Sequence, residues 1–288
     1  MIWLLLSIVC STLIFVVFKL IGKYQVNNLQ AILVNYIAAF SVGQAVNGFN
    51  PNLLDVPHQP WFWSIVLLGF LFITLFQLMA WVSQTFGVAS VSVAVKMSVI
   101  IPVSFGIWYF NEALTFLKIT GFILALLAVF LATYKPQRVK GDLKMLALPI
   151  LLFVGSGFLD AFINYNEATL VPESEHALFA SAIFGVAGLF GVLFVLYRRF
   201  TNHQSFQLKS VVGGLALGIP NYGSIYFLLL ALNEPQLPSS NLFALNNVGI
   251  VALSALIGTL AFAEKLNTFN KWGLGLALVS IVLIFYTV

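Results

Sequence analysis

The chain has 288 residues, of which 61% are hydrophobic and only 8% are charged, against about 25% charged residues in a typical soluble domain. A water-soluble fold of this length has too little interior to hide that much apolar surface, so its solvent must be lipid. The net charge of +4 is spread over short polar stretches. It therefore bears on orientation in a membrane and gives no indication of nucleic-acid binding.

Ten apolar segments follow one another along the chain, each near the roughly 20 residues that a helix needs to cross a bilayer. The first is interpreted as a membrane helix and not a signal peptide, because no basic residue precedes it and no small-residue cleavage site ends it. Helices satisfy their own backbone groups in lipid, so an all-α integral membrane protein with ten transmembrane helices is predicted. The segments are residues 2–21, 29–48, 61–86, 88–110, 115–134, 143–165, 176–198, 209–232, 239–262 and 270–287.

The second half of the sequence repeats features of the first. One ungapped shift aligns Glu112 with Glu264 and Gly121 with Gly273, together with several flanking apolar residues. The chain is therefore predicted to be two five-helix repeats, residues 1–136 and 141–288. Because five is odd, the second repeat would enter the membrane inverted, an architecture that is typical of transporters with a substrate site between the repeats.

These motifs carry a family resemblance over nearly the whole chain. The pattern resembles the EamA-type branch of the drug/metabolite transporter superfamily, and it consists of the stretch 80–89, Gly87-Val88-Ala89-Ser90, Pro102, Glu112, Gly121, Ala263-Glu264 and Gly273. The resemblance implies a ten-helix transporter with a central cavity in a bacterial inner membrane. It does not identify the cargo, because the superfamily moves amino acids, sugars, nucleotide sugars and drugs.

Polar and aromatic side chains inside the segments are the candidate substrate-binding residues. A charge at a helix centre costs about 2.5–3.5 kcal/mol on insertion scales, so Lys96 is expected to bind an anionic group of the cargo. Asp160 is the deep acid that could carry a coupling proton. The alternatives are an ion pair between Lys96 and Asp160, and interhelical hydrogen bonds for the amides. The full set is Lys96, Gln77, Trp81, Asp160, Asn221, Tyr222, Tyr226, Asn246 and Asn247.

The sequence favours alternating-access transport of a small metabolite, with a lipid flippase or a non-transporting membrane scaffold as the alternative. No nucleotide-binding loop is present, so transport would be facilitated or coupled to a proton or another ion. The three histidines form no zinc-protease motif, and no enzyme activity, metal or cofactor is expected. Glycines such as Gly214 and Gly218 predict close internal helix packing, with a homodimer as the alternative. Glu112 and Glu264 are expected at membrane borders, beside the helix that follows each.

Orientation is predicted differently by charge and by family. Lysine and arginine gather in loops of one parity and acidic residues in the others, which places the basic loops in the cytoplasm and both termini outside. Members of the resembling family are often drawn with both termini in the cytoplasm. The basic set is Lys23, Lys135, Arg138, Lys140, Lys144, Arg198, Arg199, Lys209, Lys265 and Lys271.

Overall fold

The computed structural model describes residues 1–48, 51–86, 94–133, 147–202, 207–234, 237–262 and 267–285. Within these ranges the regular structure is helical and contains no β-strand. Each predicted apolar segment overlaps one or more of the helices. They are α1 (Ile2–Lys23), α2 (Asn28–Val46), η1 (Pro51–His58), α3 (Phe62–Phe86), α5 (Ile100–Tyr109), α6 (Phe116–Thr133), α7 (Ala147–Thr169), η3 (Glu173–Glu175), α8 (His176–Asn202), α9 (Leu208–Leu232), α10 (Ser239–Phe262) and α11 (Thr268–Phe285).

Seven helical stretches in the described part of the chain are long and apolar enough to cross a membrane. They are Ile2–Lys23, Asn28–Val46, Phe62–Met79, Ala147–Thr169, Glu173–Tyr197, Leu208–Leu232 and Ser239–Phe262. Three further apolar helices are shorter, namely Ala94–Tyr109, Phe116–Leu131 and Thr268–Ile284. This architecture is consistent with an α-helical, multi-pass membrane protein. The number of ten spans and the inverted repeats stay predictions.

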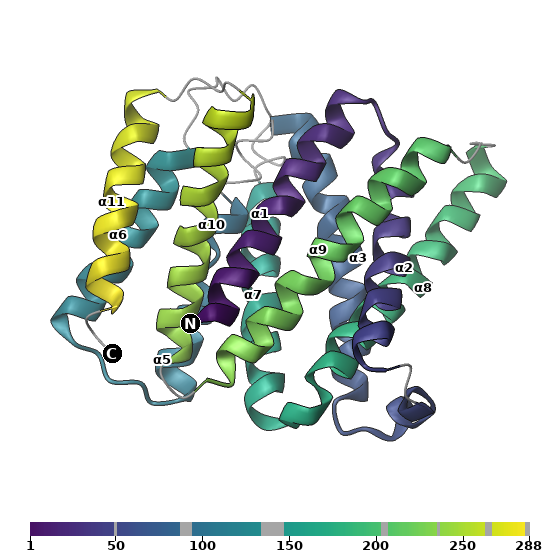
Figure 1. Ribbon diagram of the computed structural model, residues 1–288, viewed down its shortest axis with the longest axis horizontal. Coiled ribbons are helices and arrows are strands. Elements are labelled where there is room, and N and C mark those ends of the chain that lie inside the picture. The colour runs from purple at the N-terminus through teal and green to yellow at the C-terminus, as the bar shows by residue number, and fades with distance from the viewer. Residues whose placement is uncertain are drawn as a thin grey trace. The chain divides into compact units, whose positions relative to one another are not determined.

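The helices form two compact units, and each unit takes helices from both halves of the sequence. Unit 1 contains Met1–Gln77 and Tyr165–Asn233, and unit 2 contains Leu78–Asn164 and Glu234–Val288. In unit 1, α9 packs against α1 and α2, and α2 packs against α8 (Figure 1). In unit 2, α6 packs along α11, and α10 contacts α5, α6 and α11. The predicted repeats of residues 1–136 and 141–288 concern sequence duplication and stay a prediction.

Glycines on α9 bring its backbone against α2 in unit 1. A Cβ atom added at Gly214 would lie 2.4 Å from Val34 Cβ, and one at Gly218 would lie 2.5 Å from Ala38 Cβ. Real Cβ atoms do not approach this closely, so only glycine allows this helix contact. Both glycines therefore serve packing within the unit, as the sequence predicted.

We expect Gly218→Ala to destabilise the protein by about 1–3 kcal/mol, because the added methyl forces two packed backbones apart. The new Cβ would also lie 2.7 Å from the Asn35 carbonyl oxygen, which cannot rotate away. Thermal unfolding in detergent measures the effect. Gly275→Ala on α11 is the matched control, since its Cβ would meet nothing within 4 Å. Equal melting temperatures for the two variants would contradict the packing role of Gly218.

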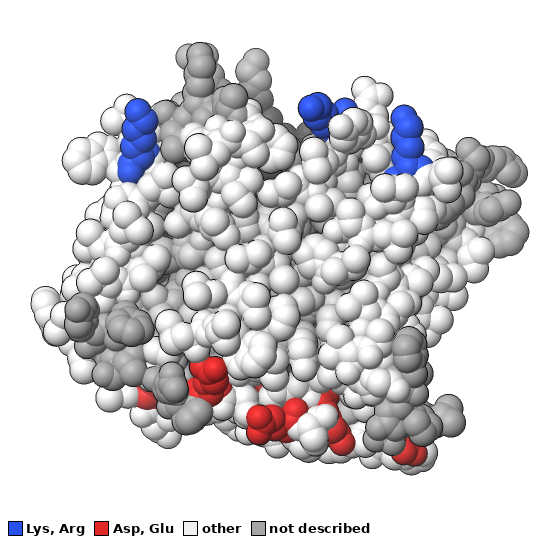
Figure 2. All heavy atoms as spheres, in the orientation of Figure 1, with Lys and Arg blue, Asp and Glu red and all other residues white. Residues whose placement is uncertain are grey.

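The two ends of unit 1 carry opposite charges. At one end, α1 ends at Lys23, and the backbone N–H of Gln207, two residues before Lys209, donates to Gln30 Oε1 at 2.9 Å. At the other end, Trp61 Nε1 donates to Glu175 Oε2 at 2.8 Å, where α3 and α8 begin. Figure 2 shows basic side chains near the first set of helix ends and acidic ones near the second. This separation is the pattern on which the predicted orientation depends.

The positive-inside rule predicts that the basic end faces the cytoplasm. In a Cys10→Ser background, a membrane-impermeant maleimide should label Glu173→Cys on intact cells and label Lys209→Cys only after permeabilisation. Both side chains are exposed, so accessibility to the reagent reports the side of the membrane. The reverse labelling pattern would support the orientation that is drawn for the resembling family.

Candidate functional site

In unit 2, the structure brings the two charged candidates together. Lys96 lies in a helical turn before α5 and is only 8% exposed, and Asp160 lies on α7. A Cβ at Gly157, one turn before Asp160, would lie 2.5 Å from Ile101 Cδ1 and 2.7 Å from the Ser98 carbonyl oxygen. This close approach brings α7 against the segment that carries Lys96. The charges of Lys96 and Asp160 are near enough to interact.

The buried asparagine side chains of unit 2 differ in whether their amide groups have hydrogen-bond partners. Asn164 follows Asp160 by one helical turn and is 1% exposed, and its Nδ2 has no hydrogen-bond partner among the described residues. On α10, the Oδ1 of buried Asn246 likewise has no partner within the described ranges. Asn247 Nδ2 donates to the Phe243 carbonyl oxygen of its own helix at 3.1 Å. Asn164 and Asn246 therefore retain capacity to bind a ligand, whereas the Asn247 donor is already engaged.

In unit 1, three candidates lie on α9 around its internal proline, Pro220. Asn221 Nδ2 donates to Asn35 Oδ1 on α2 at 3.1 Å, and both side chains are buried. The Tyr222 hydroxyl donates to the Ala177 carbonyl oxygen on α8 at 3.3 Å. The rings of Tyr222 and Tyr226 stack with centroids 5.5 Å apart. These side chains form one cluster, in which Asn221 joins α9 to α2 and Tyr222 joins α9 to α8.

An aromatic chain continues from this cluster towards Gln77. Tyr222 contacts Phe184, Phe184 stacks on Tyr36, and Tyr36 meets Phe76 edge to face at 5.7 Å between centroids. The buried hydroxyl of Tyr36 and the Nε2 of Gln77 have no hydrogen-bond partners in the part of the chain that the structure describes. Trp81 lies on α3, but its side chain is outside the described residues.

The nine predicted residues thus fall into two groups. Unit 2 holds five of them and unit 1 holds four: Lys96, Asp160, Asn246, Asn247 and the Trp81 position lie in unit 2, and Gln77, Asn221, Tyr222 and Tyr226 lie in unit 1. Within unit 2, Lys96 and Asp160 interact. Within unit 1, ring contacts connect Tyr226 and Tyr222 through Phe184, Tyr36 and Phe76 to the position next to Gln77.

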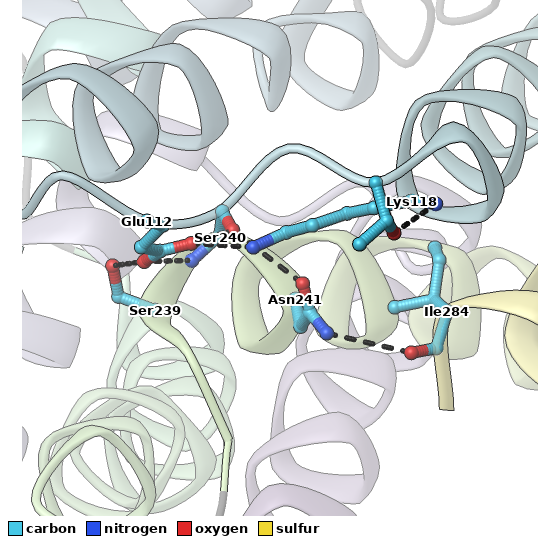
Figure 3. Close-up of polar contacts among 7 residues, drawn as sticks. Glu112, Lys118, Ser239, Ser240, Asn241 and Ile284 are labelled. Atoms are coloured by element: carbon cyan, nitrogen blue, oxygen red, sulfur yellow. Dashed lines mark hydrogen bonds and ion pairs between the residues drawn. The ribbon is translucent and has the colours of Figure 1, made fainter. Parts of the chain in front are cut away.

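Glu112 anchors a second polar cluster, which joins the turn after α5 to α6 and to α10 in unit 2 (Figure 3). Asn111 has a φ of +53°, in the left-handed region that asparagine tolerates, so the chain turns sharply after α5. The Glu112 carboxylate accepts hydrogen bonds from Lys118 Nζ at 2.8 Å, Ser239 Oγ at 3.0 Å, the Ser240 N–H at 3.2 Å and the Ser240 hydroxyl. It therefore caps the start of α10. Its contact with Lys118 near the start of α6 agrees with the expected position beside the following helix, and the bonds to Ser239 and Ser240 were not expected.

The ion pair in this cluster is nearly closed to solvent, since Lys118 is 3% and Glu112 9% exposed. Burial raises the pKa of the Glu112 carboxyl, but the hydrogen bonds from Lys118 and Ser240 and the Lys118 charge outweigh it, so the pKa lies below its ordinary value. The carboxylate thus stays ionised at neutral pH. Glu264, its predicted repeat partner, lies outside the described residues.

Sequence reasoning missed several buried polar residues of unit 1. Asn35 and Tyr36 lie in the middle of α2, and Gln44 Nε2 near its end donates to the Ser181 hydroxyl on α8 at 2.8 Å. These residues could have been found from the sequence, because each is a polar residue inside an apolar segment. His176 is the first residue of α8 and is only 1% exposed, which its place in the sequence did not indicate. Within the described ranges, no group of three or more His, Cys, Asp or Glu side chains is placed to hold a metal ion.

Comparisons with known proteins support the fold and leave the activity open. The chain matches no protein-family model. It is 26% identical over 290 residues to an uncharacterized protein of Haemophilus influenzae, and the match covers 98% of this chain and 97% of that protein. One protein crystal structure superposes with a TM-score of 0.77 over 99% of this chain and 96% of that chain, at 12% sequence identity. This likeness shows a shared fold over nearly the full length.

Proposed function

We propose that this protein is an EamA-type transporter that moves a small anionic metabolite across the bacterial inner membrane by alternating access. The observation that carries the proposal is Lys96, a charged side chain that is 8% exposed in a chain built of apolar helices. A buried ammonium is costly in such a protein, and intramembrane charges mark substrate or ion pathways by default. Its neighbour Asp160 offsets the charge when no substrate is bound.

The chemistry of the candidates suggests a division of roles. Lys96 would bind the anionic group of the cargo, for example a carboxylate, in exchange for part of its interaction with Asp160. The unpartnered amides of Asn164 and Asn246 would add hydrogen bonds to polar groups. In unit 1, taken by itself, Tyr222 and Tyr226 present stacked rings, an aromatic surface of the kind that packs on apolar groups. Two inverted five-helix repeats, with ten spans in all, would supply the rocking motion that exposes the site alternately to each side.

Uptake into vesicles tests the proposal. The purified protein is reconstituted and supplied with a panel of labelled monocarboxylates, amino acids, sugars and nucleosides, and a thermal-shift panel of the same solutes serves as the first screen. We expect uptake and stabilisation by at least one anionic member. A panel in which no solute enters faster than into protein-free vesicles, and in which none raises the melting temperature, would reject the transporter.

A further inference from the structure

His176 is a buried titratable residue that the proposed transport chemistry leaves unused. It is the first residue of α8 and 1% exposed, and neither ring nitrogen has a hydrogen-bond partner among the residues that the structure describes. Such a group is unusual, because buried polar atoms are nearly always hydrogen-bonded. Water is close by, since the preceding residues Glu173 and Ser174 are exposed.

The start of α8 is also where the rest of unit 1 holds that helix. The carbonyl of Ala177, next in sequence to His176, accepts the hydrogen bond from Tyr222. On the other side of His176, Glu175 accepts from Trp61, and the Trp61 ring meets Phe179 edge to face at 5.5 Å between centroids. Movement of His176 would therefore disturb Tyr222, a candidate substrate residue, and the Trp61 contacts together.

Protonation of His176 is disfavoured in this packed arrangement for three reasons. Burial removes the solvation of the imidazolium, both of its N–H groups would lack acceptors, and the positive end of the α8 dipole lies at the same place. Glu173 is the charge that opposes these effects, because it interacts electrostatically with the ring. The titratable groups on the elements around this helix start are Asp55 and His58 of η1, Glu167 of α7, Glu173 and Glu175 of η3, Tyr36 of α2, and Tyr222 and Tyr226 of α9. Lys209 of α9 lies at the opposite, basic end of unit 1.

We propose that the transport cycle is coupled to a proton, that His176 binds this proton, and that its protonation releases the start of α8 from Tyr222 at the acidic end of unit 1. The site takes a proton from solution on an imidazole nitrogen, and the protonated ring is stable only where water reaches it. Histidine is the side chain whose ordinary pKa places this change between pH 5 and 8. The coupling role rests on the proposed transport function, but the release of α8 can be measured without any substrate.

Hydrogen exchange tests the release directly. Exchange of the peptide covering residues 173–181, corrected for the intrinsic effect of pH, is compared at about pH 7.5 and about pH 5.5. A ring that titrates normally when released should make opening about tenfold more frequent at the lower pH. The double variant H58Q/H203Q, which leaves His176 as the single histidine, should keep the effect, and H176Q should lose it.

The outcomes separate this proposal from the transporter proposal. Exchange that does not depend on pH in the unmodified protein, or pH dependence that persists in H176Q, would overturn the role of His176 even if uptake is found. Glu173→Gln should increase the opening at low pH, because the attraction that favours the imidazolium in the packed state is lost, and an unchanged response to pH would argue against the site. If the vesicle panel is negative but the exchange follows this pattern, the transport function and the coupling role fail, and the pH-dependent release of α8 by His176 stands.

Discussion

Lys96→Met is expected to weaken uptake of the anionic cargo about 10- to 100-fold, mainly through a higher KM, because a hydrogen bond to a charged group contributes about 1.5–3 kcal/mol. Methionine matches the unbranched four-atom stem of the lysine side chain and lacks its ammonium group. Uptake of the same labelled solute into vesicles, corrected for the amount of protein inserted, gives the effect. Lys271→Met on α11 is the matched control, since that lysine is exposed and should be dispensable.

A double variant distinguishes the substrate role from a purely structural ion pair. Lys96→Met leaves Asp160 without the charge with which it interacts, so the single variant can lose activity through lost stability. Lys96→Met/Asp160→Asn removes both charges and should recover the melting temperature. If uptake recovers as well, Lys96 only balances Asp160, and the proposed binding of the anionic group is wrong. If uptake stays low in a stable protein, Lys96 acts on the cargo.

The sequence predicted the helices well because a single apolar segment in lipid can satisfy its own backbone hydrogen bonds only as a helix. An apolar run near 20 residues can hardly form anything else, so segments such as 2–21 and 239–262 correspond closely to α1 and α10. Residues 88–110 were expected as one span, and the described part of that range contains the shorter apolar helix Ala94–Tyr109, in which a turn at residues 98–99 precedes α5. Local composition does not reveal such an interruption.

The sequence predicted which residues belong to the candidate site better than it predicted which residues they contact. Lys96 and Asp160 were predicted as candidate binding residues because each is a charged residue inside an apolar segment. In the structure, their charges are near enough to interact. By contrast, no local pattern indicated that Glu112 caps α10, because its partners Ser239 and Ser240 lie far along the sequence. The same holds for the amide pair Asn35 and Asn221. Long-range polar contacts depend on how helices pack, which a single sequence does not state.

Glu112→Gln is expected to lower stability by about 3–5 kcal/mol, because it leaves the Lys118 ammonium buried beside a neutral amide. The amide also cannot accept on both of its terminal atoms, so one of the contacts with Ser239 and Ser240 is lost. Denaturant or thermal unfolding in detergent measures the loss. Asp55→Asn is the control, as that carboxylate is exposed and its neutralisation should change little.

The double variant and the pH dependence show whether the ion pair itself is responsible. Glu112→Gln/Lys118→Met removes both charges and should regain most of the lost stability, whereas a purely geometric cap would leave the double variant as weak as the single one. Because the pKa of Glu112 in the folded protein lies below its ordinary value of 4.5, its contribution is complete above that pH and disappears as the pH falls through the lower, folded value. The stability difference between the unmodified protein and Glu112→Gln should therefore be constant near neutrality and shrink in acid. A difference that stays constant down to pH values where the carboxyl is protonated would mean that its charge does not stabilise the start of α10.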